Sequence, residues 1–332
     1  MDFIEVIEAS LRTAVGTTAI VYALAAIGLN VHFGYTGLLN FGQVGFMGVG
    51  AYGVAIATDP DILGWPLWAG ILVSIGAAVV LALLLGLPTL RLRADYLAIV
   101  TIAAGEIFRV LIQNPGWRDT TGGANGINGF SNTFYEINPI PAGRYGFGPF
   151  HYSSRGLWAL LVGWGMVVLC ALAVGLLMRS PWGRVLKSVR EDEDAARSLG
   201  KNAYGFKLQS LVVGGVLGGL AGLYQSVEKA SATPGNYKPE TTFFIYAGLI
   251  LGGVARTWGP VLGSMLLVAL LEFMDGMLRG AIVEGWIPES WMDTTQIGQV
   301  RLVLVGVGLA CLVIFRPQGI FGDKREIALE AR

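Results

Sequence analysis

The apolar stretch LWALLVGWGMVVLCALAVGLL, residues 157–177, decides the fold class of this chain. Two further runs, Ala69 to Leu87 and Val300 to Phe315, have the same character. About 20 apolar residues in a helix cross the roughly 30 Å hydrocarbon layer of a membrane, and these runs approach or reach that length. Lipid cannot satisfy exposed backbone N–H and C=O groups, and no alternating strand pattern is present. The sequence therefore predicts an all-α, polytopic integral membrane protein.

The composition of the whole chain agrees with this class. Hydrophobic residues make up 54% and charged residues 14% of the 332 residues, whereas soluble domains carry about 25% charge. The formal net charge is zero, which argues against a nucleic-acid partner. Met1 to Glu8 is acidic where a cleavable signal peptide would be basic, so the first apolar segment is expected to remain. Cys170 and Cys311 lie inside apolar segments without metal-ligand spacing and are interpreted as packing residues.

Hydropathy predicts a bundle of about eight to ten transmembrane segments in one permease domain, residues 1–332. The candidate spans are residues 10–30, 36–57, 66–89, 96–113, 156–178, 206–227, 242–254, 259–278 and 298–315. The 242–254 segment is too short to cross comfortably, and glycines flank it. A broken or re-entrant element is therefore expected near 242–258, where surrounding protein would have to satisfy its backbone.

Lysine and arginine in short loops set the orientation of a membrane protein. Cations cluster after the third span, in a polar insert at 180–206 and after the last span. These regions, including the tail at 317–332, are expected in the cytoplasm. The loop at 114–155 carries few cations and is expected outside. Threading the spans puts the N-terminus outside and the C-terminus inside, although a re-entrant seventh segment would change this parity.

Glycine is abundant, with 48 residues, and it is concentrated on helix faces. Gly214, Gly218 and Gly222 recur every four residues, a spacing that lets two helix backbones approach closely in lipid. Helix packing is the favoured interpretation. The alternative is that glycine-rich helices slide or tilt against each other, as an alternating-access transporter requires.

The polar insert interrupts the apolar chain between Ser180 and Gly200. The run from Arg184 to Leu199 is rich in helix formers and ends at Gly200, a common helix stop. A short helix is expected to begin around Val189, with the acidic cluster near its start, where the helix dipole favours negative charge. Such a surface helix would dock on a partner through its less polar residues, Val189, Ala195, Ala196 and Leu199.

The insert also carries a recognisable motif, because Asp194-Ala195-Ala196 followed by Gly200 matches the EAA...G signature of ABC importer membrane subunits, with Asp in place of Glu. The longer run from Gly183 to Gly200 closely resembles the membrane subunits of branched-chain amino acid ABC importers, the LivM type of the LivH/LivM family. Further similar stretches follow in chain order and are spread along most of the chain. They are residues 37–42, 50–52, 91–101, 121–127, 251–253, 258–263 and 315–319.

This resemblance implies a permease subunit in a prokaryotic cell membrane, with ATP hydrolysis in separate subunits. The implied partners are a second, homologous permease of LivH type, two ABC ATPase subunits and an external solute-binding protein. The implied solutes are leucine, isoleucine and valine; related members handle urea, short amides or other amino acids. The insert would be a coupling helix pressed against the ATPase, through Arg190, Glu191, Asp192, Asp194, Ala195, Ala196, Leu199 and Gly200. The Leu-Pro that often follows the signature glycine is replaced here by Tyr204-Gly205-Phe206, so docking geometry cannot be transferred from other importer classes.

Two polar pairs inside apolar spans are candidates for the substrate path. Glu106 and Arg109 lie three residues apart, and embedded ionisable residues are costly enough to suggest function. A mutual ion pair that only stabilises packing is slightly favoured over a path lining. Asn40 and Gln43, also three apart, either contact a passing solute or bridge helices, and bridging is the commoner role.

Other chemistry has little support in the sequence. His32, near the inner interface, and His151, in the outward loop, lack partner spacing for a metal or a catalytic triad, and the Gly122–Gly126 stretch lacks the Gly-Lys-Ser/Thr ending of a phosphate loop. No catalytic residue, metal site or cofactor is predicted. The rival class is an ion-coupled secondary transporter with Glu106 as its cation or proton site. Trp117 and Tyr135 are candidates for docking the solute-binding protein.

Overall fold

The computed structural model describes residues 3–90, 94–148, 150–285, 296–316 and 319–321. Among these residues six helical segments are long and apolar enough to cross a membrane. They are α2 with the π-helix η1 (Thr17–Leu29 and Asn30–Tyr35), α4 (Leu67–Thr89), α5 (Ala94–Gln113), α8 (Ser154–Arg179), α11 (Ala203–Lys229) and α13 (Gly259–Val283). The helices α3 (Gln43–Thr58), α12 (Pro239–Gly252) and α14 (Ile297–Phe315) accompany them. The predicted polytopic helical membrane fold is confirmed.

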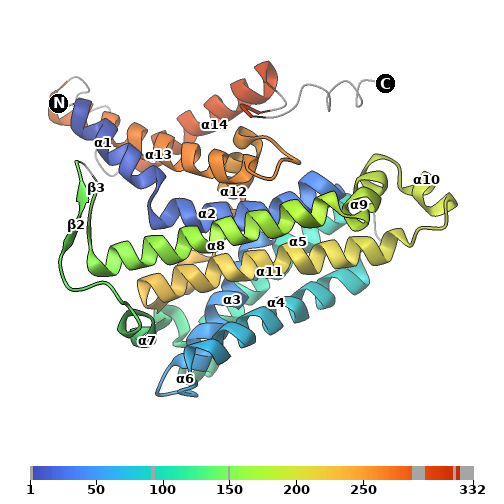
Figure 1. Cartoon of the computed structure of the whole chain (residues 1–332), viewed down its shortest axis with the longest axis horizontal. Helices are drawn as coiled ribbons and strands as arrows, with labels where there is room; N and C mark the ends of the chain where they lie inside the picture. The colour runs from blue at the N-terminus through green and yellow to red at the C-terminus, as the bar shows by residue number, and fades with distance from the viewer. Residues whose placement is uncertain (1–2, 91–93, 149, 286–295, 317–318, 322–332) are drawn as a thin grey trace.

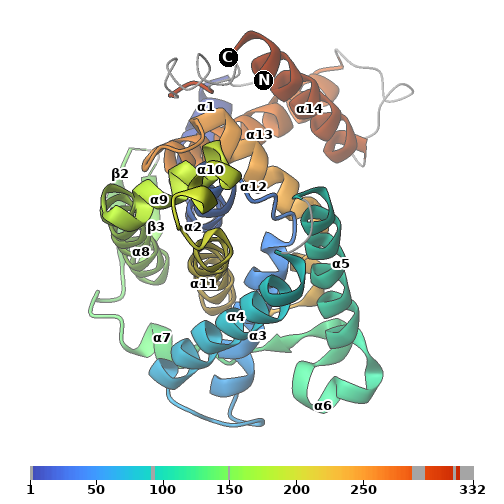
Figure 2. The same ribbon diagram turned by 90° about the vertical axis from the view of Figure 1, so that its right-hand side faces the viewer.

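Helix α11 lies at the centre of the bundle (Figure 2), where it packs against α2, α3 and α4. The main core is built from the apolar faces of α2, α3, α8, α11 and α12. The outer faces of α4, α5 and α8 carry exposed leucine, isoleucine and valine side chains. An apolar outer surface over spanning helices is what contact with lipid or with another membrane subunit requires.

The first predicted span, 10–30, is wrong at its start. An amphipathic helix, α1 (Phe3–Ala14), ends before α2 begins at Thr17, and the chain bends between them at Gly16. Helix α1 lies along α13 (Figure 1), where Val6 packs over Gly276. Hydropathy merged the two helices because Gly16 is compatible with an apolar span, whereas it ends α1 here.

The second predicted span, 36–57, is also wrong at its start, because its helix begins at Gln43. Residues 37–42 are not helical, and Gly37 has a φ of 73°, a left-handed conformation that glycine adopts without a Cβ penalty. Before this stretch, the π-helix η1 (Asn30–Tyr35) extends α2. A π-helix and a non-helical turn therefore interrupt what the sequence suggested was the start of a regular helix.

The short element predicted near 242–258 is seen as the 14-residue helix α12 followed by a break from Gly253 to Trp258. The break contains Ala255 at φ 58°. Asn30 of η1 holds it: Asn30 Nδ2 donates to Arg256 O at 2.9 Å, and Ala255 N donates to Asn30 Oδ1 at 2.9 Å. The Asn30 side chain thus hydrogen-bonds to backbone groups of this irregular segment. Non-helical backbone within a membrane requires such partners from the protein.

Two groups of small elements occupy opposite ends of the bundle (Figure 1). At one end lie α9 (Pro181–Glu191) and α10 (Glu193–Ser198). At the other end lie α6 (Arg118–Thr121), α7 (Asn132–Glu136) and the hairpin of β2 (Arg144–Phe147) with β3 (Phe150–Ser153). There β1 (Ile127–Asn128) pairs antiparallel with β4 (Ser231–Ala232), just after α11. The polar insert and the long loop at 114–155 are therefore separated by the length of α11.

Candidate functional sites

Three fully buried polar side chains, His32, Asn40 and Gln43, meet inside the bundle, and we call them the polar junction. Asn40 Nδ2 lies 3.0 Å from His32 Nδ1 and 3.1 Å from Gln43 Oε1. His32 Nε2 lies 3.1 Å from Leu211 O on α11. Since the amide donates to Nδ1, Nε2 carries the proton and donates to that carbonyl, so a neutral imidazole satisfies both contacts.

The polar junction joins η1 and α3, which carry His32 and Gln43, to α2, α11 and α12. Gln43 Nε2 donates to Ala25 O of α2 at 3.3 Å and to Gly214 O of α11 at 3.2 Å. Tyr246 of α12 donates its hydroxyl to Asn40 O at 3.1 Å. In this conformation Asn40 and Gln43 bridge helices, the commoner of the two roles expected for them. His32, interpreted from sequence as isolated, is a member of this network, and the turn at Gly37 brings it to Asn40.

The glycine row of α11 makes room for the polar junction. A Cβ on Gly214 would lie 2.3 Å from His32 Nε2, and one on Gly218 would lie 2.6 Å from Gln43 Nε2. One turn on, a Cβ on Gly222 would lie 1.8 Å from Met47 O of α3, so at that position two backbones meet. Two of the three glycines thus face buried polar side chains, and the third faces a backbone.

Glu106 and Arg109 lie on α5 and form an ion pair within that helix. Arg109 Nε donates to Glu106 Oε2 at 2.8 Å, and Arg109 Nη2 contacts Glu106 Oε1. The side chains are 38% exposed for Glu106 and 21% exposed for Arg109. The pair therefore neutralises itself on a partly open face of α5, unlike the enclosed amides of the polar junction.

The helix of the polar insert begins earlier than predicted. Helix α9 starts at Pro181, not near Val189, because proline is favoured in the first turn of a helix and Gly183 lets the chain fold tightly over Met178. The chain breaks at Asp192, whose carboxylate accepts from Ala195 N at 2.9 Å and caps α10. Glu193 and Asp194 follow in the first turn of α10, so acidic residues do lie at a helix start. Gly200, at φ 77°, follows its end.

The expected docking residues of the insert divide into two sets. Val189 and Ala196 are each 3% exposed and pack with Ala203 inside this chain, so the prediction that they face a partner is wrong. Leu199 is 80% exposed, so its apolar side chain is free to contact another molecule. The remaining exposed members are Glu191, Asp192, Asp194, Ala195 and Gly200. The sequence could not separate the sets, because the break at Asp192 changes which face of the second helix is covered.

Helix α9 is also in contact with the π-helix that carries His32. Arg190 Nη1 donates to Gly34 O, and Lys187 Nζ lies 5.8 Å from the ring centroid of Tyr35. In α10, Glu193 accepts from Arg197 at 2.7 Å and also contacts Lys207 of α11. The insert is thereby tied to both η1 and α11.

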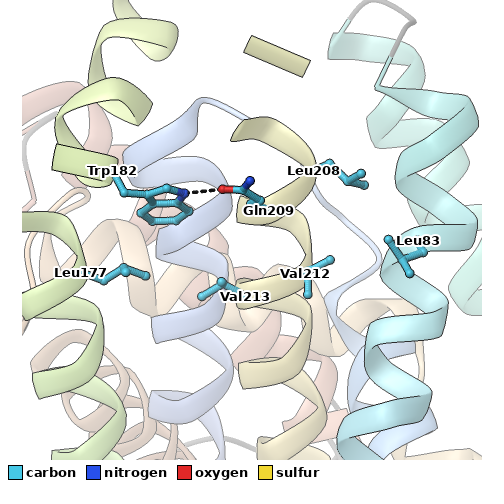
Figure 3. Close-up of a pocket in the computed structure, with 7 residues that line it drawn as sticks. All are labelled: Leu83, Leu177, Trp182, Leu208, Gln209, Val212 and Val213. Atoms are coloured by element: carbon cyan, nitrogen blue, oxygen red, sulfur yellow. Dashed lines mark hydrogen bonds between the residues drawn. The ribbon is translucent and has the colours of Figure 1, made fainter. Parts of the chain in front are cut away.

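A groove of about 510 Å³ lies between α4, α8 and α11, next to the start of α9 (Figure 3). Its walls are Leu83, Leu177, Leu208, Val212 and Val213, and at its rim Trp182 Nε1 donates to Gln209 Oε1 at 2.7 Å. This bond joins α9 to α11, in addition to the contact of Glu193 in α10 with Lys207. The apolar walls make the groove a lipid-compatible surface and not a polar path.

In the part of the chain that the structure describes, no three His, Cys, Asp or Glu side chains gather closely enough to hold a metal ion. The glycine-rich stretch near Gly126 serves a close backbone contact. At φ 69° Gly126 packs its Cα against the strand β4, where a Cβ would lie 2.2 Å from Ala232 O.

The bundle of spanning helices, its buried polar junction and the tethered α9–α10 pair define a multi-pass membrane permease. Residues 12–296 match the family model described as the permease component of the branched-chain amino acid transport system, and the chain belongs to that family. It is thus a permease component of an ABC-type transport system and not itself an ATPase.

Several characterised proteins are similar to this chain over most of its length. The high-affinity branched-chain amino acid transport system permease protein LivM of Escherichia coli K12 is 31% identical over 92% of this chain and 69% of its own length. Its Salmonella typhimurium counterpart is 30% identical with the same coverage. The nucleoside ABC transporter permease protein NupC of Lactococcus lactis is 26% identical over 76% of each chain. Similarity at this level therefore extends to permeases named for different solutes.

Proposed function

We propose that this chain forms half of the translocation path of an ABC importer for leucine, isoleucine and valine. Its partners are a second permease of the same family, two ATPase subunits and an external solute-binding protein. Membership in the family and 31% identity to a LivM protein support the solute class. The observation that carries the mechanism is the contact of α9 with η1, because it links an exposed helix pair to the buried polar junction.

In this mechanism the exposed side of the α9–α10 pair docks on an ATPase subunit at the cytoplasmic face. Leu199 supplies an apolar anchor, and Asp194 and Glu191 supply surrounding negative charge. Closure of the ATPases displaces α9, and Arg190 transmits the displacement to the carbonyl of Gly34. The π-helix η1 is the element that yields, since its wider hydrogen-bonding pattern is less regular than that of an α-helix.

Displacement of η1 then acts on the polar junction and on the break after α12. His32 and Asn30 are both on η1, and they hold α11 and the 253–258 segment respectively. A change in η1 therefore reaches two parts of the bundle at once. The glycine row of α11 allows the adjoining helices to tilt without side-chain clashes. Exposure of the path would alternate between the two faces of the membrane through this movement.

The test is uptake of labelled leucine into proteoliposomes that contain the assembled importer and its binding protein. Uptake is expected to require ATP on the side of the membrane that carries the ATPase subunits. An uncoupler is not expected to reduce it. Uptake by this chain alone that is abolished by an uncoupler would overturn the proposal in favour of an ion-coupled carrier. Competition by isoleucine and valine, but not by urea or a nucleoside, is expected; preferential competition by urea or short amides would reassign the solute.

Docking is tested with Leu199→Asp, which places a charge on the exposed anchor without entering the core. Ala196 and Gly200 are unsuitable, because the first is buried and the second has a left-handed φ. Loss of one interface anchor worth about 1–3 kcal/mol should weaken binding of the ATPase to the purified permease by about 5- to 150-fold, which is measured as lower recovery of the ATPase with the permease. Thr133→Asp, exposed on α7 at the opposite end of the bundle, is the matched control and is expected to retain the ATPase. Equal recovery with both variants would contradict the assigned docking surface.

A further inference from the structure

A partly enclosed polar chamber of about 170 Å³ lies at the C-terminal end of α11, whereas α9 and α10 precede its N-terminal end. Its walls include Thr17, Thr18 and Tyr22 of α2, Gln225 and Glu228 of α11, and Thr241 of α12. A cavity needs only about 10–15 Å³ to hold one water molecule. The chamber therefore has room for a polar group larger than a single water.

Gln225 and Glu228, which line this chamber, each carry a buried acceptor atom without a hydrogen-bond partner among the described residues, namely Gln225 Oε1 and Glu228 Oε2. The Thr17 side chain hydrogen-bonds to the Glu228 carboxylate, and Lys229 acts on the same carboxylate by its charge. A buried acceptor left without a donor costs about 1–3 kcal/mol, more for a charged group. An amide carbonyl and a carboxylate oxygen at one cavity together suit a ligand with several N–H donors, as an ammonium group has.

The chamber also contains the N-terminus of a helix. Helix α2 begins at Thr17 behind Gly16, and no side chain caps its first turn. Unsatisfied N–H groups and the positive end of the helix dipole favour a carboxylate at this position. The walls of the chamber thus present negative character at Glu228 and positive character at Lys229 and at the N-terminus of α2, which matches the two charged ends of a zwitterion.

A wider pocket of about 480 Å³ adjoins the chamber, because Thr17 and Thr18 line both. Its walls also carry Arg12, Glu272 and Tyr152. The Tyr152 hydroxyl is a third buried polar atom without a hydrogen-bond partner in the described structure. The wider pocket thus places charges of both signs beside the chamber.

We propose that the chamber binds the ammonium group of the transported solute, with Glu228 and Gln225 as its acceptors and the N-terminus of α2 facing the solute carboxylate. This inference rests on the proposed import of amino acids and assigns where the solute first engages this subunit. Glu228 lies at the far end of α11 from the α9–α10 pair, so the chamber is separate from the polar junction and from the ATPase contact.

The occupant is tested by thiol labelling in the assembled importer. Thr241→Cys is placed in a background with Cys170→Ala and Cys311→Ala, and its labelling by a cationic and an anionic methanethiosulfonate is compared. The cationic reagent is expected to react at least tenfold faster than the anionic one, and Glu228→Gln is expected to remove this preference. Millimolar leucine should slow the labelling several-fold, whereas 4-methyl-2-oxopentanoate, which lacks the ammonium group, should not.

Thr133→Cys, exposed on α7, is the matched control and is expected to show neither effect. Labelling of Thr241→Cys that leucine does not change would mean that the chamber holds only water and would overturn the inference. Equal protection by sodium or potassium ions would overturn the assignment to an ammonium group.

Transport separates this inference from the proposed function. Glu228→Gln is expected to lower ATP-driven leucine uptake at least tenfold at equal amounts of assembled complex, with partial recovery in Glu228→Asp. If the wild-type importer takes up leucine and Glu228→Gln does so equally well, the role proposed for the chamber is overturned and the importer assignment is left intact. A wild-type importer that fails to take up leucine would instead overturn the proposed solute.

Discussion

The α9–α10 pair and the polar junction are both polar, but the pair is exposed at the surface and the junction is buried in the bundle. In the pair, charged side chains such as Asp194 project outward, and Leu199, which follows the end of α10, is exposed. In the polar junction, every polar side chain is fully buried and hydrogen-bonded, as burial away from water requires. An exposed surface can change partner without disturbing the fold, whereas a closed network can change only if several helices move together.

Among the buried contacts, the largest effect of a substitution is expected at Gly222, where α11 meets the backbone of α3. Gly222→Val is expected to prevent folding, because its Cβ would lie 1.8 Å from Met47 O and a backbone atom cannot move aside. The cost should exceed the roughly 1–3 kcal/mol that is typical of overpacking. Recovery of folded protein in detergent is the measurement. Gly165→Val, on α8 with no atom within 4 Å of its Cβ, is the control, and equal losses would contradict a special role for the glycine row.

A smaller effect is expected from Gln43→Leu within the polar junction. The substitution removes hydrogen bonds to Ala25 O and Gly214 O and leaves Asn40 Nδ2 with one fewer acceptor. Unsatisfied buried groups cost about 1–3 kcal/mol each, so the thermal midpoint should fall by several degrees. Gln209→Leu on exposed α11 surface serves for comparison and should shift the midpoint less. A more stable Gln43→Leu protein would show that the junction is not satisfied as described.

Arg190→Ala tests the link between the two regions. Loss of a charge-assisted hydrogen bond worth about 1.5–3 kcal/mol should lower leucine uptake about tenfold while ATP hydrolysis continues, because α9 would move without η1. Arg184→Ala, on the same helix and bonded to Arg179 O, is the control. If uptake and hydrolysis fall in proportion for Arg190→Ala, the substitution has weakened ATPase docking and the link to η1 is not the coupling route.

The smallest stability change is expected for Glu106→Gln on α5. Its partner is on the same helix, and partly exposed pairs of this kind contribute about 0–1 kcal/mol. The informative measurement is uptake at equal amounts of protein, with Arg109→Gln measured in parallel. A tenfold loss of uptake in both variants would support a path lining. Intact uptake with only less folded protein would leave the pair a packing feature.

Much of the architecture was predictable from apolar runs, because a lipid environment imposes helix on any long segment without charge. The spans near 66–89, 96–113, 156–178 and 206–227 correspond to α4, α5, α8 and α11. The starts of the first two spans were not predictable, since Gly16 and Gly37 are compatible with an apolar helix yet end or interrupt one here. The contact of His32 with Asn40 was not predictable for the same reason. It depends on the π-helix η1 and on the turn at Gly37.

The sequence by itself determined that this chain is a helical membrane protein and where its exposed polar insert lies, because hydropathy and the positions of charge act locally along the chain. It also contained the family motifs around Asp194 and Gly200. Only the tertiary structure decided which insert residues are exposed, how the amides are satisfied and where unsatisfied acceptors remain at Gln225 and Glu228. Those properties depend on neighbours far apart in sequence, whose distances follow from how the glycine-lined helices pack.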